Sequence, residues 1–498
     1  MVNSVNNEQV IPETTTSVNI SENLKKVVLL VAVLGVLMSA IDSTIVILAL
    51  PAIDIALKTT AINSVWVIMA YILIITVMST QVGKLGDNFG RARMFNLGFL
   101  IFIIGSALCG FSLDVYQLIF FRLIQGVGGA LISSNSGAII SDYFDRHERG
   151  KAFGYTAVGW NIGAILGIVL GGLLAEFDWR LIFLINVPIG ILVVPIGFIK
   201  VKDIVPKLNE KMDILGSVLL GISLLIISYL SVFIIGSGFD ILAFLMVILS
   251  IVFAILFILR EYFAKSPILD LGLFRSKIFA FSVISAMLQF TASFAVLFLL
   301  TIYLQGALGL NPFIASLYLL PGYVLGALLS PFMGRFSDKY GARILATVGL
   351  SATGIGYLFY IGFLWENSPA YTVAIITMIT GLGSAMFFPA NSSAIMAHAP
   401  QGKYGMASGT TRMLNNVGMV LSFTIALSVA SLSIPSYIVL EIFVGTTTGL
   451  SGLNPTAGKD FVNGLHVAFF VSFIIIIIAA LMSAIRGKEN RRGANQNG

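Results

Sequence analysis

The sequence predicts an all-α polytopic membrane protein with fourteen transmembrane helices. Three observations predict it: the composition, a succession of long apolar segments, and an uneven distribution of lysine and arginine between the loops. Of the 498 residues, 57% are hydrophobic and only 10% are charged, and the mean hydropathy is +0.98. A soluble protein of this size would carry about 25% charged residues. The composition therefore places most of the chain in a lipid bilayer.

Fourteen apolar segments follow one another along the chain. A helix of about 20 apolar residues crosses the hydrocarbon core of a bilayer, which is roughly 30 Å thick. The fourth, tenth and thirteenth segments contain more small and polar residues, which is typical of helices that face other helices or a wet cavity. The segments centre on Met38, Leu73, Ile103, Gly126, Ala164, Val193, Leu224, Ile248, Ala292, Tyr323, Tyr357, Ile379, Val420 and Ile475.

The distribution of positive charge gives the direction of the spans. With the N-terminus inside, the outer loops hold only Lys58, Arg180 and Lys459, and the inner loops and tails hold nearly all the other lysines and arginines. Such an asymmetry predicts that both termini are cytoplasmic. We expect the chain in the cytoplasmic membrane of a prokaryote. The net charge of +6 is thus a topology signal, and no nucleic-acid partner is expected.

The ends of the chain and one outer segment carry no predicted site. Residues 1–24 are polar without a basic region, so we expect a disordered cytoplasmic tail, and 487–498 form a second tail. The outer segment 431–460 receives no function. The single cysteine, Cys109, excludes an internal disulfide and a cysteine-based metal site, and no metal site is predicted.

Two similar charged strings reveal an internal repeat. GKLGDNFGRARMF joins the second and third spans, and GRFSDKYGARIL joins the tenth and eleventh. A shift of eight spans fits two six-span halves with two further spans between them. The expected boundaries are 25–202, 203–262 and 263–486. Transporters built from two such parallel halves hold their substrate near the middle of the membrane, between the halves.

The spacing within these strings suggests a loop that controls a conformational change. Gly83 permits close helix packing, Asp87 caps a helix or forms an ion pair, and Gly90 permits a turn with positive φ. Arg91 is expected to pair with Asp142 or Asp145, and such a pair must break when the two halves rock. The residues expected to gate the change are Gly83, Asp87, Gly90, Arg91, Arg93 and Asp142, with Gly334, Asp338, Gly341 and Arg343 in the second copy.

Further strings resemble a known family. The two loops look like the signature of the major facilitator superfamily, and FRLIQGVGGALISS in the fourth span is similar to its R-x-x-Q-G-x-G-x-A motif. IDSTIVILALPAI and DWRLIFLINVPIG resemble motifs of its fourteen-span drug:proton antiporters, over about residues 25–485. The resemblance implies a major facilitator fold: two six-helix bundles and two linking helices. It also implies a role in proton transfer for Arg122, and Gly126 and Gly129 after it would let the fourth span pack closely.

The fifth span departs from the antiporter pattern. It reads GYTAVGWNIGAILGIVLGG, and Ile168 stands where antiporters usually have a proline. The small-residue face is retained, but the proline bend is lost, which weakens the case for export over import. The glycines expected to pack this helix are Gly163, Gly167, Gly171 and Gly172.

Ionisable residues inside spans are rare here and are candidates for function. Asp42 lies eight residues before Leu50, at the outer end of the first span, and is therefore about 12 Å deep. Arg122 lies about 10 Å deep in the fourth span. An acid and a base at one depth should either pair or compete for a proton. Proton coupling or substrate contact is the favoured interpretation, and a static ion pair is the alternative.

Other polar residues could line a cavity, although a satisfied contact between helices is the commoner fate of each. Arg412 could either act in function or extend its side chain to the inner interface. We find no acid buried mid-span in the second half. The cavity candidates besides Asp42 are Gln125, Trp160, Asn161, Gln289, Tyr323, Asn391 and Asn415.

These features predict a transporter and not an enzyme. The chain lacks G-x-x-x-x-G-K-[ST], so no ATP site and no cofactor are expected, and the proton gradient supplies the energy. The favoured function is export of small amphipathic or cationic compounds in exchange for protons. Proton-coupled transport of a metabolite such as an amino acid or sugar is the second possibility, and a non-transporting membrane sensor is the third. The expected partners are a small-molecule substrate, protons and the lipid bilayer, and we expect a monomer.

Overall fold

The computed structural model is helical throughout the residues that it describes, which are 21–204, 211–264, 266–400, 404–433 and 457–487. No strand occurs in these ranges. Thirteen helices are long and apolar enough to cross a membrane, and the bent helix α2 makes fourteen. Each predicted segment centre lies in one of them, so the predicted fold class is confirmed. Most of the two tails and of the outer segment 431–460 lies outside the described residues.

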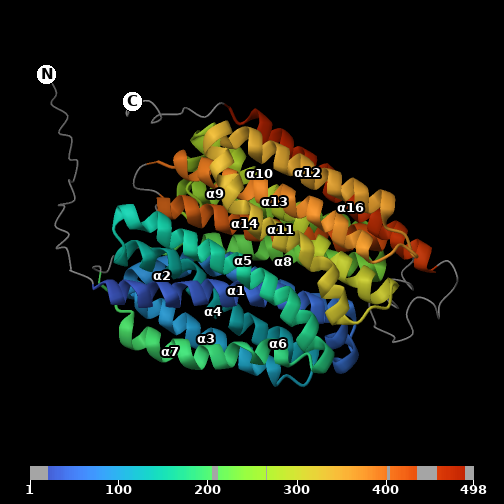
Figure 1. The fold of residues 1–498 in the computed structure, drawn as a ribbon, viewed down its shortest axis with the longest axis horizontal. Coiled ribbons are helices and arrows are strands. Elements are labelled where there is room, and N and C mark those ends of the chain that lie inside the picture. Colours follow the sequence, from blue (N-terminus) through green and yellow to red (C-terminus); the bar gives the residue numbers. More distant parts are fainter. Residues whose placement is uncertain (1–20, 205–210, 265, 401–403, 434–456, 488–498) are drawn as a thin grey trace.

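The helices run side by side along one common direction (Figure 1). The start of α1 and the end of α16 lie at the same end of the molecule, which we call the basic end. The first half comprises α1 (Glu22–Leu57), α2 (Ala61–Phe89), α3 (Arg91–Gly110), α4 (Val115–Tyr143), α5 (Arg146–Phe177), α6 (Leu181–Leu184) and α7 (Asn186–Lys200).

The second half repeats this plan after two linking helices, α8 (Ile214–Ser237) and α9 (Ile241–Phe263). A 3₁₀ segment, η1 (Leu271–Arg275), leads into the half, and a π-helical turn, η2 (Tyr303–Ala307), ends its first helix. Its helices are α10 (Lys277–Ile302), α11 (Pro312–Tyr340), α12 (Ala342–Phe363), α13 (Tyr371–Ala397), α14 (Tyr404–Ser433) and α16 (Ala457–Ile485).

The pattern of helix contacts is the same in both halves. In the first half α1 packs on α5, α2 and α3 pack on α4, and α3 packs on α7. The second half shows the corresponding pairs: α10 with α14, α11 and α12 with α13, and α12 with α16. The two halves meet mainly through α5 with α11 and α2 with α14, and these pairs correspond to each other when the halves are exchanged.

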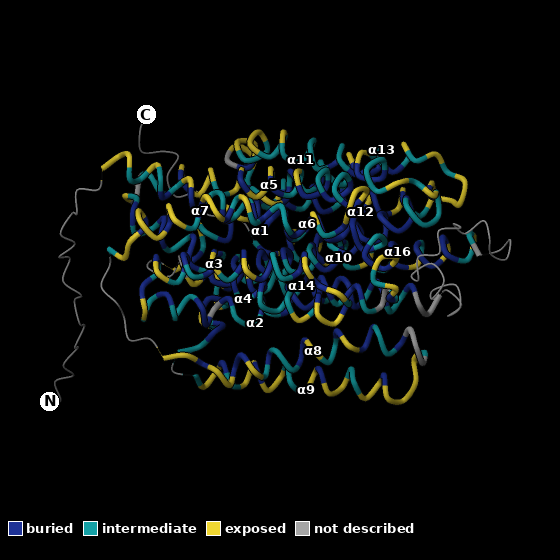
Figure 2. The backbone as a smooth tube through the Cα atoms, turned by 90° about the horizontal axis from the view of Figure 1, so that it is seen from below, coloured by how far each residue is buried: buried dark blue, intermediate teal, exposed yellow. Residues whose placement is uncertain are grey.

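The linking helices lie to one side of the two halves (Figure 2). α8 packs on α14 and α2, whereas α9 packs mainly on α8. Most large apolar side chains of α9 are exposed, as expected for a helix that faces lipid on most sides. The linking helices therefore lie on the outside of the bundle, and the interface between the halves is formed mainly by the other helices.

Two glycines make the tight turns of the repeated strings possible. Gly90 ends α2 with φ +112°, and Gly341 ends α11 with φ +97°. Residues with a side chain rarely adopt such angles, so glycine is needed at both places. The next helix begins directly after each turn, which keeps the loops short.

The contact between the halves is closed at one end of α5 and open at the other. Gly172 lies against α11: a methyl group there would come within 2.6 Å of the Pro312 carbonyl oxygen. Gly154 lies 18 residues earlier, which is five helical turns, and therefore on the same face of α5. Among the described residues, a methyl group at Gly154 would meet nothing within 4 Å. This face of α5 is thus in contact away from the basic end and free towards it.

Two hydrogen bonds support the closed side. The Gln305 side chain donates to the carbonyl of Leu48 at 3.1 Å, and Asn311 donates to Glu176 at 3.4 Å. Both bonds join the first half to the second. Both lie near the end opposite the basic end, where α1 and α5 finish.

Candidate functional site

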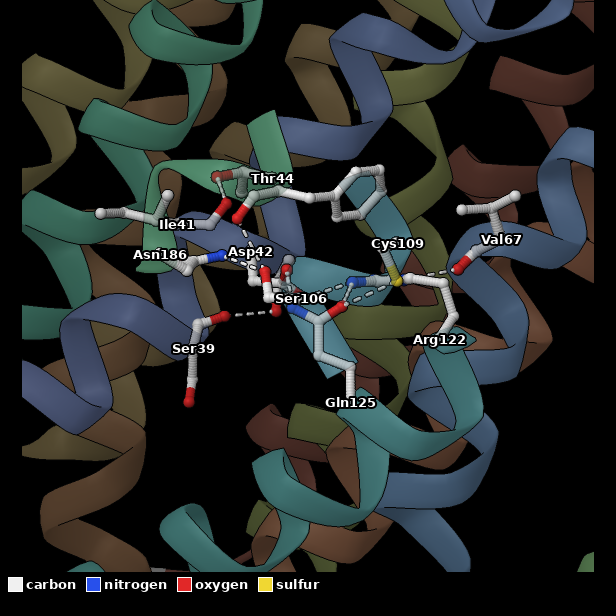
Figure 3. A network of polar contacts seen from close by, with 12 residues as sticks. Ser39, Ile41, Asp42, Thr44, Val67, Ser106, Cys109, Arg122, Gln125 and Asn186 are labelled. Carbon is white, nitrogen blue, oxygen red and sulfur yellow. Dashed lines mark hydrogen bonds and ion pairs between the residues drawn. The ribbon is translucent and has the colours of Figure 1, made fainter. Parts of the chain in front are cut away.

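An ion pair and a glutamine form a closed network in the core of the first half (Figure 3). Arg122 Nη1 donates to Asp42 Oδ2 at 2.7 Å and to Gln125 Oε1 at 2.7 Å. Gln125 Nε2 donates to Asp42 Oδ1 at 2.8 Å. Asp42 and Gln125 are 0% exposed and Arg122 is 1% exposed. Each carboxylate oxygen therefore has a donor, and the whole network is shielded from solvent.

Two helices supply these three side chains. Asp42 lies on α1, while Arg122 and Gln125 lie three residues apart on α4 and so share one side of that helix. The depth argument from the sequence required Asp42 and Arg122 to lie at one level, and the structure brings them into contact.

Glycines bring the neighbouring helices close to the network. A methyl group at Gly163, Gly167 or Gly171 of α5 would come within 2.6 to 2.8 Å of a backbone carbonyl oxygen of α1. Gly126 and Gly129 of α4 lie against α2, where a methyl group at Gly129 would come within 2.9 Å of the Tyr71 hydroxyl. All five were predicted from the sequence as packing glycines. They let backbones approach where a larger residue would hold them apart.

The residues that surround the Arg122 guanidinium were not predicted from the sequence. Its Nε donates to the carbonyl oxygen of Val67 at 2.9 Å, and its Cζ lies 4.2 Å from the centre of the Tyr71 ring. The Phe183 ring lies 5.6 Å from the same atom. A tyrosine in an apolar span was the only available hint. These groups would still hold Arg122 if Asp42 were neutral, because none of them depends on the carboxylate charge.

A second polar contact lies beside the network. The Cys109 thiol is 3.7 Å from Gln125 Oε1 and is fully buried, which agrees with the expectation of a buried, free thiol. Asn186 donates to Ser106 Oγ at 3.0 Å, and Ser106 in turn donates to the carbonyl of Phe183 at 2.8 Å. These bonds tie α3 to the short helices α6 and α7. The network is therefore set in a fully packed core.

The first charged loop forms the second group of predicted residues. Arg91 Nε lies 2.7 Å from Asp87 Oδ1, and Arg91 Nη1 lies 2.5 Å from Asp142 Oδ1. Of the two partners considered for Arg91, the structure selects Asp142. Asp145 instead lies 3.5 Å from Lys25. The arginine thus links the α2–α3 turn to the end of α4.

One residue of this loop cluster was missed from the sequence. Asp203 follows α7, and its Oδ1 accepts a hydrogen bond from the amide of Ala92 at 2.7 Å. Its carboxylate lies over Gly90, so a side chain at that glycine would collide with it. Gly90 is therefore required for both its backbone angle and its closeness to Asp203. Of the other predicted loop residues, Arg93 is exposed. A methyl group placed at Gly83 would meet none of the described residues within 4 Å, so the close helix packing expected at Gly83 is not found.

The second charged loop is less constrained in what the structure describes. Gly341 makes the turn, and Arg343 is partly exposed beyond it. Among the atoms that the structure describes, only Pro389 Cβ lies near a methyl group placed at Gly334, at 3.8 Å. The side chain of Asp338 lies outside the described residues.

The predicted cavity residues divide into two groups. Asn161 on α5 and Tyr323 on α11 are partly exposed and lie close to the faces on which Gly172 and Ser316 meet. Trp160 is 40% exposed and Asn415 is partly exposed. These positions are compatible with a lining role.

Two of the predicted cavity residues are buried in the second half instead. Asn391 donates to the carbonyl of Ser282 at 3.0 Å and accepts from Arg486 at 3.0 Å, so its amide joins helices. Gln289 is 1% exposed. Sequence could not separate these two from the lining group, because a polar residue in a span looks the same in either setting.

Comparison with known proteins agrees with this architecture. The family model described as Major Facilitator Superfamily matches residues 32–423 and 282–497. The chain is 33% identical to the riboflavin transporter RibZ of Clostridioides difficile over 80% of this chain and 86% of the relative. It is 31% identical to multidrug resistance protein 3 of Bacillus subtilis over 83% of this chain and 80% of the relative.

A solved structure shows the same fold. The crystal structure of a bacterial homologue of the human lysosomal transporter Spinster, inward-facing and occupied, superposes with a TM-score of 0.67 at 17% identity. The superposition covers 94% of this chain and 97% of the other. Together with the repeated helix contacts and the match to the family model, these similarities confirm the predicted family. The chain belongs to the major facilitator superfamily and is a multi-pass membrane transporter.

Proposed function

We propose that this transporter couples the movement of protons to the export of small amphipathic compounds, and that Asp42 carries the proton. The observation that carries the proposal is the buried network of Asp42, Arg122 and Gln125. A buried ion pair is weak support for stability, because desolvation of two charges offsets their attraction. Its presence in the core of a transporter half therefore favours a functional role.

The chemistry of the network suggests how a proton would act. Protonation of Asp42 removes the negative charge that Arg122 faces. The guanidinium then keeps the Val67 carbonyl, the Gln125 side chain and the Tyr71 ring as partners. The contact between α1 and α4 weakens, while α1 stays packed on α5. A change in the contact between α1 and α4 would shift the equilibrium between two orientations of the halves.

Coupling in this proposal is indirect. The expectation that substrate cations bind at Asp42 required an accessible carboxylate, whereas this one is 0% exposed in the present conformation. We therefore assign Asp42 to the proton and leave the substrate to the space between the halves. The named relative in Bacillus subtilis, a multidrug resistance protein, supports export as the direction.

Transport of a metabolite is the second candidate. Ile168 replaces the antiporter proline in the middle of α5 and is fully buried. The relative in Clostridioides difficile is named a riboflavin transporter. Riboflavin therefore belongs among the first compounds to be tried.

The test is proton release from the purified protein in detergent when a compound is added. Tetraphenylphosphonium, 2-naphthoate and riboflavin form a first panel. We expect release by the wild type with at least one compound, and no release by Asp42→Asn. Asp54→Asn is the matched control, because Asp54 is also a buried acid of α1 but contacts the neutral Ser64. Compound binding without proton release by the wild type would remove Asp42 from the coupling role.

A further inference from the structure

Arg412 places a positive charge between the two halves. It lies on α14, which packs on α2 and α4 of the first half as well as on its own half. Its Nη1 donates to the backbone carbonyl of Ser133 on α4, across the interface. A guanidinium has five N–H donors, so most of its capacity is left for another partner.

The guanidinium borders an internal space. Arg412 is eight residues beyond the start of α14, about 12 Å into the bundle. The residue is nonetheless exposed at this depth. Because α14 packs on α2 and α4 of the other half, this exposure indicates an opening between the halves beside Arg412. Gly154 is also eight residues beyond the start of its helix, and there the α5 face is open.

Negative charge is scarce at this depth. No carboxylate of the described residues lies within 4.0 Å of the Arg412 nitrogens. The sequences of α10, α12, α13 and α14 contain no Asp or Glu at all. Asp42, the acid at mid-depth in the first half, is engaged by Arg122 and Gln125. The space beside Arg412 is therefore a cationic one.

We infer that this transporter takes substrates that carry an anionic group, bound by Arg412, on an otherwise apolar body. A carboxylate fits best, because its two oxygens match the fork of the guanidinium. The inference refines the proposed function, on which it rests, by naming the substrate class. Asn415 lies one turn deeper on the same side of α14, and its buried amide oxygen accepts no hydrogen bond from the described residues. When no substrate is present, the Ser133 carbonyl accepts one hydrogen bond from the Arg412 guanidinium.

Three probes with one ring system test this inference: 2-naphthoate, 2-naphthamide and trimethyl(2-naphthyl)ammonium. Binding to the full-length protein is measured by equilibrium dialysis against protein-free micelles. We expect the acid to bind about tenfold or more tightly than the amide, as a hydrogen-bonded charge predicts, and the cation to bind weakest. Arg412→Gln should abolish the difference between acid and amide, and Arg412→Lys should retain part of it.

The matched control is Arg335→Gln, which removes one positive charge from an exposed position of α11. It should leave the ratio of acid to amide binding unchanged. An unchanged ratio in Arg412→Gln, an equal change in Arg335→Gln, tighter binding of the amide or the cation by the wild type, or no binding of any probe would each overturn the inference. Arg412 would then serve only as a contact between the halves.

The binding assay needs no proton gradient, so the two proposals fail separately. Preferential binding of the acid without proton release would contradict the proposed coupling and leave the substrate class standing. Proton release on addition of the cation alone, unaffected by Arg412→Gln, would support coupling and overturn the substrate class.

Discussion

The two halves share a helix plan but differ in the polarity of their cores. In the first half, the central contact is the charged network of Asp42, Arg122 and Gln125. In the central part of the second half, the Ser293 and Tyr357 hydroxyls form a neutral hydrogen bond at 2.6 Å between α10 and α12. One plan can therefore hold either kind of core. The difference suggests that protonation acts on the first half. The second half holds its buried charge, Arg486, near the basic end instead, on Ser282 and Asn391.

The largest expected effect comes from removing one partner of the ion pair. Arg122→Gln leaves the Asp42 carboxylate buried without its positive partner, and we expect a loss of about 3 to 5 kcal/mol in the free energy of unfolding. The double variant Asp42→Asn with Arg122→Gln should regain much of this loss, because no charge stays buried. Denaturant unfolding in detergent measures both. If Arg122→Gln lost less than about 1 kcal/mol, as exposed ion pairs do, the pair of Asp42 and Arg122 would not be a water-free pair in which each charge needs the other.

Close packing beside the network gives the next effect. In Gly167→Ala the new methyl group lies 2.8 Å from the carbonyl oxygen of Ile41, the residue before Asp42. We expect overpacking to cost about 1 to 3 kcal/mol and to slow proton release. Gly154→Ala on the same helix is the control. Its methyl group meets none of the described residues within 4 Å, and alanine favours the helix by up to about 1 kcal/mol. Equal unfolding curves for the two variants would refute the packing argument.

The charged loop should affect transport more than stability. Arg91→Gln breaks the contacts with Asp87 and Asp142, which are partly exposed, so the loss of stability should stay below about 1 kcal/mol. If these contacts hold one orientation of the halves, the transport rate in proteoliposomes should fall about fivefold, the equivalent of roughly 1 kcal/mol. Arg93→Gln, an exposed position on the same turn, should transport at the wild-type rate. A normal transport rate in Arg91→Gln would mean that the positive charges of the loop only set the membrane orientation of the chain.

The smallest effect is expected at the neutral contact between Ser293 and Tyr357 in the second half. Tyr357→Phe removes one hydroxyl from the bond with Ser293, which should cost about 1 kcal/mol. Proton release should be unchanged, since no charged group is involved. A loss of proton release in this variant, at normal folding, would mean that both halves take part in coupling.

Some features of the site followed from the sequence and others did not. The contact between Asp42 and Arg122 could be expected from their equal depth, because helix geometry converts residue number into depth. Tyr71 and the Val67 carbonyl could not be expected, because which face of α2 meets Arg122 depends on helix packing. Asp203 was missed for the same reason. It lies far from Gly90 in the sequence, and the two residues meet only because α7 packs against α3.

The sequence by itself determined the class of this protein. Apolar runs must span a bilayer, positive loops predict the orientation, and the repeated strings with their glycines require two similar halves with tight turns. Only the tertiary structure decided which polar residues meet. It buried Asn391 in a helix contact and left Arg412 open between the halves. The physical reason is that the spacing of residues along a helix sets their depth and relative direction, whereas the rotation and closeness of neighbouring helices arise from packing over the whole bundle.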